Sequence, residues 1–181
     1  MSKLVETIAS AIVLGIHNKD DENMGYMVRD VLSKLDKVEV KVFRENETVK
    51  LPTYAKDGDA CMDVYVHGIE TKPDGRIVYH TGLHFRLPED YEMEIRPRSS
   101  NTKTRAIMQN APGTLDEGYT GELLIVHRHL DDYLFPEYNI GDRVAQIIVR
   151  RRERIEWKEV TTQEELGITE RGDGGYGSTG K

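Results

Sequence analysis

The stretch Val38-Glu39-Val40-Lys41-Val42 decides the fold class, because apolar and charged residues alternate along it one by one. A period of two predicts a β-strand with one buried face. Comparable runs, each bounded by Gly, Pro or Asp as in the turn Pro73-Asp74-Gly75, follow at residues 84–87, 92–95, 122–127, 144–149 and 155–159. Many short strands separated by turns predict an all-β domain of the sandwich or jelly-roll type.

Residues 1–37 follow a different pattern. Apolar residues recur every four positions at Leu4, Ile8, Ile12 and Ile16 and again, after an acidic break at 20–25, at Met27, Val31 and Leu35. This spacing predicts two short amphipathic helices. The apolar run at 8–16 is too short to span a bilayer, so we expect no membrane association.

The composition limits the classes of partner. The 181 residues carry a net charge of -7, whereas binding to a nucleic-acid polymer requires a basic face. We therefore expect no nucleic-acid polymer as a partner, while a small anion bound in a local pocket is compatible with this charge. The single cysteine, Cys61, cannot form an internal disulfide, which favours a reducing compartment such as the cytoplasm.

The C-terminal stretch Arg171-Gly-Asp-Gly-Gly-Tyr-Gly-Ser-Thr-Gly-Lys181 is rich in hydrogen-bond donors. It has five glycines in its last ten residues, and ordering each backbone unit costs roughly 1–2 kcal/mol. Its N–H groups, hydroxyls and guanidinium suit a triphosphate, and Tyr176 offers a flat surface for a base. The residues alone leave the alternative of a solvated, frayed terminus open.

Two further segments combine polar groups with turn signals. Residues 97–103 suit an anion cradle, and equally a polar turn capped by serine. Residues 110–122 form a Gly/Pro-punctuated hairpin in which Asp116 is either a general base or a turn residue bonded to its own backbone. Asp63 and Gln146 are polar residues in otherwise apolar strands, and each needs a partner if it is buried.

Together, five segments closely resemble the five motifs of the trimeric dUTPase family, in the same order: ACMDV (60–64), PRSSNTK (97–103), NAPGTLDEGYTGE (110–122), GDRVAQIIV (141–149) and RGDGGYGSTG (171–180). The resemblance covers about residues 38–181. It implies a jelly-roll (β-clip) domain at 38–169, preceded by the helical extension at 1–37 and followed by a flexible Gly-rich arm at 170–181 that acts as a lid. It also implies a homotrimer with active sites between subunits.

The activity implied by the resemblance is hydrolysis of dUTP to dUMP and pyrophosphate, which lowers dUTP and supplies dUMP for thymidylate synthesis. Asp116 would activate the water that attacks the α-phosphorus in line with the leaving pyrophosphate. Tyr119 would pack beneath the deoxyribose and exclude a 2′-hydroxyl. Asn110 and the hairpin backbone would pair with the uracil edge, where cytosine presents the opposite donors and acceptors, and thymine would be excluded sterically.

The contacts to the triphosphate follow from the same match. Phosphate contacts are implied for Arg98, Ser99, Ser100 and Gln146, with the Ser99 hydroxyl near the oxygen of the breaking bond. Mg²⁺ is expected to be held mainly by the phosphates and waters, with Asp63 acting through water. From the arm, substrate contacts are implied for Arg171, Tyr176, Gly177, Ser178 and Thr179.

One residue departs from the family motifs, and one pair of histidines lies outside them. Cys61 stands where glycine is usual, and we interpret it as a buried thiol without a function. His127 and His129 share a face of a predicted strand. Because no third ligand is evident, we interpret them as an interface or surface pair rather than a metal site.

Two alternative functions accompany this interpretation. A dCTP deaminase shares the fold and the Arg-Ser-Ser segment but needs a catalytic glutamate at the position that Val126 occupies here. A regulatory binding protein would use the same trimer and residues 1–37 to hold a protein or DNA partner. Release of ammonia from dCTP would identify the deaminase, and removal of residues 1–37 would test the binding protein.

Overall fold

The structure is a computed structural model that describes residues 37–131 and 134–174. The predicted N-terminal helices and the arm residues Tyr176, Gly177, Ser178 and Thr179 lie outside these ranges. Within them the chain forms nine β-strands and two short 3-10 helices, which confirms the all-β prediction. In the same ranges, no helix is both long and apolar enough to cross a membrane.

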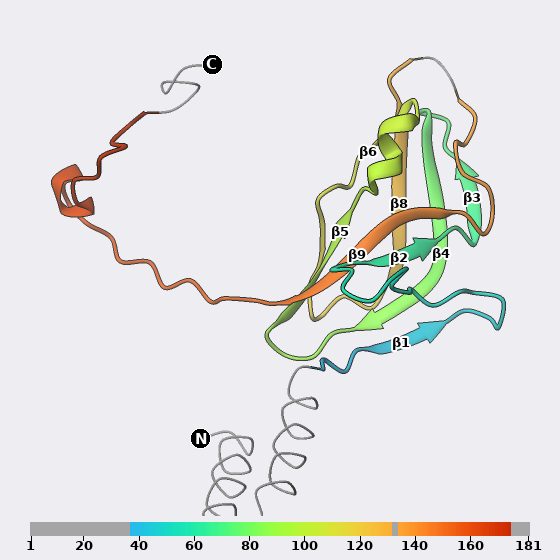
Figure 1. Cartoon of the computed structure of the whole chain (residues 1–181), viewed down its shortest axis with the longest axis horizontal. Helices are drawn as coiled ribbons and strands as arrows, with labels where there is room; N and C mark the ends of the chain where they lie inside the picture. Colours follow the sequence, from blue (N-terminus) through green and yellow to red (C-terminus); the bar gives the residue numbers. More distant parts are fainter. Residues whose placement is uncertain (1–36, 132–133, 175–181) are drawn as a thin grey trace, which may run out of the picture.

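Two antiparallel sheets pack against each other (Figure 1). The first sheet has the order β1-β4-β8-β6, and β3 pairs with the half of β4 that β1 does not reach. Its strands are β1 (Lys41–Arg44), β3 (Gly68–Thr71), β4 (Arg76–Arg86), β6 (Ala106–Met108) and β8 (Glu122–His129). The second sheet has the order β2-β9-β5-β7, with strands β2 (Met62–Tyr65), β5 (Tyr91–Arg96), β7 (Gly113–Leu115) and β9 (Arg143–Arg151). The 3-10 helices are η1 (Ser99–Lys103) and η2 (Gln163–Leu166).

The alternation in the sequence decides which side chains fill the space between the sheets. In β8, Leu123 and Ile125 are fully buried, whereas Leu124 between them is partly exposed. The facing sheet contributes Ile147 of β9 and Met93 of β5 to the same core. Each such side chain stabilises the fold by roughly 1.5–3 kcal/mol when it leaves water.

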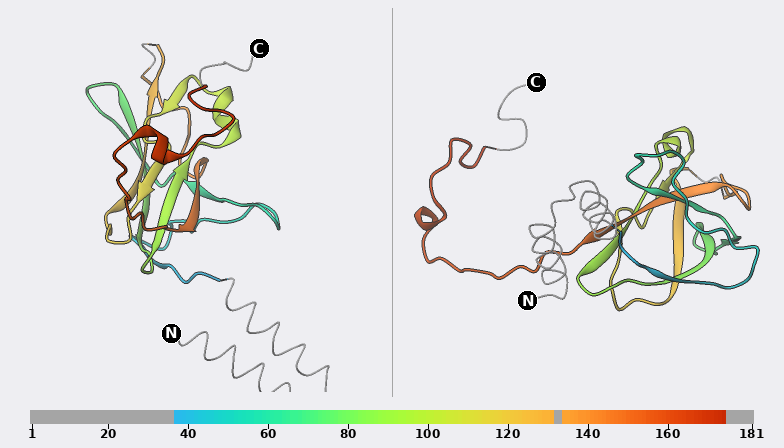
Figure 2. Two further views of the ribbon diagram at one scale, coloured as in Figure 1. Left: turned by 90° about the vertical axis from the view of Figure 1, so that its left-hand side faces the viewer. Right: turned by 60° about the horizontal axis from the view of Figure 1, so that its bottom comes forward.

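The chain leaves the sandwich after β9, and the prediction of a strand at 155–159 is wrong. In this segment Ile155 and Trp157 are 71% and 86% exposed. A strand requires a neighbouring strand to satisfy its backbone, and no described strand of this chain pairs with these residues. Residues 152–174 instead extend away from the sandwich, as Figure 1 and the right-hand view of Figure 2 show.

The predicted surface or interface pair His127 and His129 is buried within the chain, because the inward positions of β8 continue to its end. His127 is 0% exposed, and its ring contacts Tyr79 and Tyr138 edge to face at centroid distances of 5.2 and 5.6 Å. Neither nitrogen of His127 has a hydrogen-bond partner among the described residues. Burial lowers the pKa of His127 from 6.5 to about 4, because the charged ring would lose its hydration.

We predict that His127 makes the fold sensitive to acid. Between pH 6.5 and about 4 the unfolded chain binds a proton at His127 that the folded chain does not, so stability falls by roughly 1.4 kcal/mol per pH unit. His127→Phe retains a ring between the two tyrosines and should flatten this decline. Thermal unfolding monitored by circular dichroism across this pH range measures it.

The matched control is His67→Asn, which changes a partly exposed histidine and should keep the wild-type dependence of the unfolding midpoint on pH. A His127→Phe protein whose midpoint falls with acid as steeply as that of the wild type would contradict the assignment.

Candidate functional site

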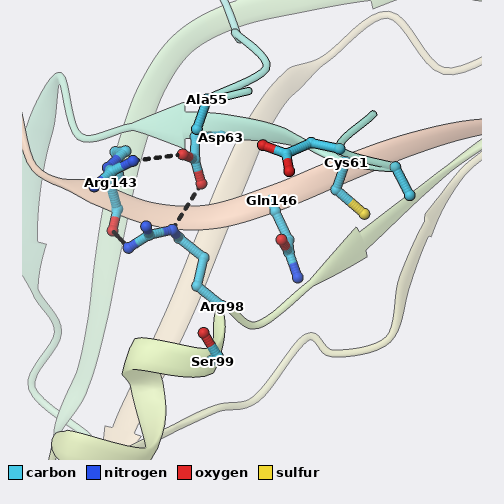
Figure 3. Close-up of a pocket in the computed structure, with 9 residues that line it drawn as sticks. Ala55, Cys61, Asp63, Arg98, Ser99, Arg143 and Gln146 are labelled. Atoms are coloured by element: carbon cyan, nitrogen blue, oxygen red, sulfur yellow. Dashed lines mark hydrogen bonds and ion pairs between the residues drawn. The ribbon is translucent and has the colours of Figure 1, made fainter. Parts of the chain in front are cut away.

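The carboxylate of Asp63 organises a polar pocket at one edge of the second sheet. Asp63, on β2, is 8% exposed, and each of its oxygens accepts a hydrogen bond from a different arginine (Figure 3). Arg98 Nε lies 2.7 Å from Oδ1, and Arg143 Nη1 lies 3.0 Å from Oδ2. Two guanidinium groups face one carboxylate, so the three side chains together carry a positive charge.

The loop that follows β5 brings the next polar groups to this pocket. Arg98 Nη1 donates to Ser100 Oγ at 2.9 Å and to Arg143 O at 3.2 Å, which fixes the guanidinium from several sides. Ser99, the first residue of η1, is exposed and lines the pocket. Guanidinium and hydroxyl donors gathered at one place provide the chemistry that binds an anion.

The pocket has a volume of about 290 Å³ and is lined by Ala55, Asp59, Ala60, Cys61, Asp63, Arg98, Ser99, Arg143 and Gln146. Gln146 lies opposite Asp63 in the pairing of β9 with β2, and its Nε2 donates to Pro97 O at 3.0 Å. Cys61, which was expected to be buried, is partly exposed. It directly precedes β2, an edge strand that pairs with β9 on one side and forms an isolated bridge between Asp63 and Thr53 on the other.

A second pocket, of about 370 Å³, lies at the loop of the hairpin formed by β6 and β8, within which β7 pairs with β5 of the other sheet. This pocket is lined by Ile95, Asn110, Gly113, Thr114, Leu115, Tyr119, Glu122, Leu123 and Leu124. The Asn110 amide anchors it to β8, donating to Leu124 O at 2.8 Å and accepting from Val126 N at 2.9 Å. A Cβ at Gly113 would lie 2.6 Å from Asn110 O, so only glycine allows this close approach of the backbone.

The turn that follows Asp116 is held in place by several hydrogen bonds. The Tyr119 N–H donates to Asp116 O at 3.0 Å, and the Tyr119 hydroxyl donates to Glu122 O at 3.0 Å. Glu117 accepts a hydrogen bond from Arg152 at 3.1 Å, just beyond β9. Asp116 itself is exposed. Its neighbours therefore fix the backbone, while its carboxylate stays accessible to water.

The predicted site residues fall into two groups at opposite edges of the second sheet. The β2 edge has the pocket with Asp63, Arg98, Ser99 and Gln146, and the β7 edge has the pocket with Asn110 and Tyr119. Three strand spacings, about 14 Å, separate these edges. Asp116 and Ser100 line neither cavity, and Arg171 lies on the arm, where its Nε donates to Gly174 O at 3.0 Å. A single chain therefore does not bring all these residues together.

Arg143 is the residue that the sequence analysis missed. A basic residue at the start of a strand usually contacts solvent, and its partner Asp63 lies 80 positions away in the chain. The sequence contains one hint of its role, because Arg143 lies three residues before Gln146 in the segment 141–149. Its side chain is 46% exposed, so it can contact a ligand while it pairs with Asp63.

The pocket offers a metal ion two carboxylates, Asp63 and the exposed Asp59. Among the residues that the structure describes, no three His, Cys, Asp or Glu side chains converge as metal ligands. Each Asp63 oxygen accepts one arginine bond and retains a lone pair that can accept a hydrogen bond from a metal-bound water. Asp63 therefore fits an indirect role beside hydrated Mg²⁺ whose direct ligands come from phosphates.

An arginine-rich anion pocket at one edge of the second sheet and a largely apolar pocket with a few polar groups at the other edge suit a protein of the nucleotide-binding class. The family model for dUTPase matches residues 47–180. The chain belongs to the dUTPase family.

Individual relatives agree with this assignment. The deoxyuridine 5'-triphosphate nucleotidohydrolase of Fusobacterium nucleatum is 42% identical over 151 residues, which cover 81% of this chain and 100% of the relative. The enzyme of the same name from Mycobacterium tuberculosis is 37% identical over 143 residues, covering 77% of this chain and 93% of the relative.

Solved structures share the fold. A mutant dUTPase of Staphylococcus bacteriophage 80alpha with dUpNHpp has a TM-score of 0.62 at 23% identity, covering 79% of this chain and 99% of that chain. A mutant dUTPase from phage phi11 of S. aureus, whose structure reveals the coordination of a structural Mg(II) ion, has a TM-score of 0.54 at 22% identity, covering 70% and 99%.

We predict that Asp63→Ala destabilises the protein by roughly 2–3 kcal/mol, because it leaves two partly buried guanidinium groups without their counter-charge. Pyrophosphate should restore part of this loss by taking the place of the carboxylate. Thermal melts with and without millimolar pyrophosphate should thus show a larger stabilisation for the variant than for the wild type.

Asp59→Ala is the matched control, since Asp59 lines the same pocket but is exposed and accepts only a local bond from Lys56 N at 2.9 Å. Two results would refute the role given to Asp63. The first is that Asp63→Ala and Asp59→Ala are equally stable. The second is that pyrophosphate raises the unfolding midpoint of Asp63→Ala no more than that of the wild type.

Proposed function

We propose that this protein hydrolyses dUTP to dUMP and pyrophosphate. The proposal rests on one observation: Asp63 holds two arginines, Arg98 and Arg143, in one pocket. Ser99 and Gln146 line the same pocket. This pocket suits a chain of phosphates, and the hairpin pocket suits a base and a sugar. Family membership and relatives named deoxyuridine 5'-triphosphate nucleotidohydrolase support uracil as the base.

We further propose that each active site is shared between chains of a homotrimer. The two pockets lie at opposite edges of one sheet, so the phosphate pocket of one chain is completed by the hairpin pocket of another. The segment 152–174 extends away from the sandwich (Figure 1). It supports this arrangement, because its apolar Ile155 and Trp157 are largely exposed and would be covered by another chain.

The hairpin pocket accounts for the choice of base and sugar. The uracil edge pairs with the backbone around Asn110, whose side chain is held by β8 and keeps this backbone in place. Cytosine would leave buried donors and acceptors mispaired there, which rejects a ligand by about 10⁴–10⁵-fold. Thymine is excluded because the hairpin backbone, in which Gly113 closely approaches Asn110 O, is held too rigidly to widen for a methyl group. Tyr119 packs against the deoxyribose where a 2′-hydroxyl would need space.

The chemical step is an in-line attack of water on the α-phosphorus. Asp116, exposed on its fixed turn, accepts the proton of the attacking water. Arg98, Ser99, Ser100 and Gln146 bind the phosphates and stabilise the negative charge that grows on the leaving pyrophosphate. Mg²⁺ bound through the phosphates would neutralise part of their charge, and Asp63 would accept a hydrogen bond from its hydration water.

The arm supplies the closing contacts. Arg171, Ser178 and Thr179 bind the γ-phosphate, Gly177 lets the backbone approach it, and Tyr176 stacks on uracil. Ordering this Gly-rich segment is costly, so a ligand with three phosphates is favoured over dUMP. We place the reaction in the cytoplasm, where it lowers dUTP and supplies dUMP for thymidylate synthesis.

A substrate panel tests the activity. With Mg²⁺ present, we expect pyrophosphate release from dUTP and rates lower by at least about 10²-fold from dCTP, dTTP and UTP. Ammonia is measured in the same samples. Ammonia from dCTP would indicate a deaminase instead, and inactivity towards all four nucleotides would indicate a binding protein.

The role of Asp116 has its own test. Asp116→Asn should still bind dUTP with Mg²⁺, while kcat falls by about 10²–10⁴-fold, because an amide cannot accept the proton of the water. Calorimetric titration with a non-hydrolysable dUTP analogue measures binding, and pyrophosphate release measures turnover. A turnover close to that of the wild type would overturn the assignment of Asp116 as the base.

A further inference from the structure

β4 contains an irregularity that is bridged by a carboxylate from β8. The pairing of β4 with β8 changes register between His80 and His84. Within this stretch Gly82 has a φ of +65°, and a Cβ there would lie 2.6 Å from Val49 Cγ2. The Gly82 N–H donates to Glu122 Oε1 at 2.8 Å. Glu122 thus replaces the strand-to-strand bond that the irregularity removes.

His80 contacts the other oxygen of the same carboxylate. Its Nδ1 lies 2.9 Å from Glu122 Oε2, and its Nε2 lies 3.6 Å from Glu70 Oε2 on β3. Lys72 also pairs with Glu70, at 2.6 Å. The His80 ring therefore lies between carboxylates from two neighbouring strands.

His84 reaches the same turn from a position farther along β4. Its Nδ1 lies 3.0 Å from Thr120 O, and its Nε2 lies 3.3 Å from Glu45 Oε1. A carbonyl oxygen can only accept a hydrogen bond, so Nδ1 of His84 carries the hydrogen. A single strand thus contacts both Thr120 and Glu122.

These contacts end on the residues that shape the hairpin pocket. Tyr119 and Glu122 line the cavity, and the Tyr119 hydroxyl donates to Glu122 O at 3.0 Å. Thr120 follows Tyr119 directly. His80 and His84 are not among the residues that line this cavity, so they act on its wall from behind.

We propose that His80 and His84 are positioning residues that hold the turn at 119–122, and with it the deoxyribose wall of the substrate pocket. The inference rests on the proposed function, because it assigns this pocket to dUTP. Both histidines act through Glu122 and Thr120 rather than on the substrate. Their loss therefore affects KM more than the chemical step.

The charge of the histidines determines how firmly the turn is held. The hydrogen bond with Glu122 raises the pKa of His80, and the bond with Thr120 O raises the pKa of His84. The charged groups that face the two rings are Glu45, Glu70 and Glu122, with Lys72 paired to Glu70. As pH rises through the raised pKa values, each ring loses a proton and one charge-assisted contact, so KM should increase.

The test compares KM and kcat for dUTP in the wild type, His80→Ala/His84→Ala and His80→Asn/His84→Asn between about pH 6.5 and pH 8.5. At the lower pH we expect KM of the alanine pair to exceed that of the wild type by about tenfold, with kcat within about twofold. The ratio should shrink to about threefold as pH rises and the wild-type rings lose their protons. Substrate titration is the same in every assay and cancels in the ratio.

Asparagine carries an uncharged donor close to the position of the histidine Nδ1. The double variant His80→Asn/His84→Asn (the asparagine pair) should therefore recover most of the affinity for dUTP, and its KM should not depend on the charge of these side chains. His67→Asn is the control. His67 pairs with Asn46 at 3.2 Å, so this variant should keep the wild-type dependence of KM on pH.

If the alanine pair does not fold, the dependence of KM on pH in the asparagine pair still tests the proposal. A KM ratio of unity for the alanine pair at the lower pH, or a ratio that does not change with pH in either pair, would overturn the proposal. A wild type without dUTP turnover would instead refute the proposed function.

Discussion

The antiparallel pairing of β9 with β2 on one side and with β5 on the other is the constraint on which the site depends. Gln146 lies opposite Asp63 in the first pairing and opposite Arg96 in the second. Because side chains alternate along a strand, a slip by one residue would turn Gln146 into the core and Ile147 out of it. Burial of the apolar inner face therefore determines where the polar groups of the phosphate pocket lie.

Each pocket is organised by one carboxylate that bonds to two partners. Asp63 pairs with Arg98 and Arg143, and Glu122 pairs with the Gly82 N–H and with His80. In the first case the surplus charge is positive, which lets a chain with a net charge of -7 attract an anion locally. In the second case the carboxylate joins β4 to β8 and fixes the turn that precedes β8.

The sequence predicted much of the fold, because alternation is a local property. The runs at 92–95, 122–127 and 144–149 lie within β5, β8 and β9, and the run at 38–42 overlaps β1. The run at 155–159 alternates equally well but lacks a partner strand, which no local pattern reveals. Contacts between residues far apart in the sequence also explain why Arg143 was missed and why the burial of Cys61 and of His127 was predicted wrongly.

The candidate residues were predicted from motifs, yet their grouping into two pockets depends on the strand order. That order leads to the proposal that one active site uses Arg98 of one chain and Asp116 of another. The most direct test refolds Arg98→Ala and Asp116→Asn chains together in equal amounts and measures dUTP turnover. Shared sites predict recovery of about a quarter of the wild-type activity, since random mixing reunites both intact groups in that fraction of sites. Activity no higher than that of the two variants assayed separately would contradict it.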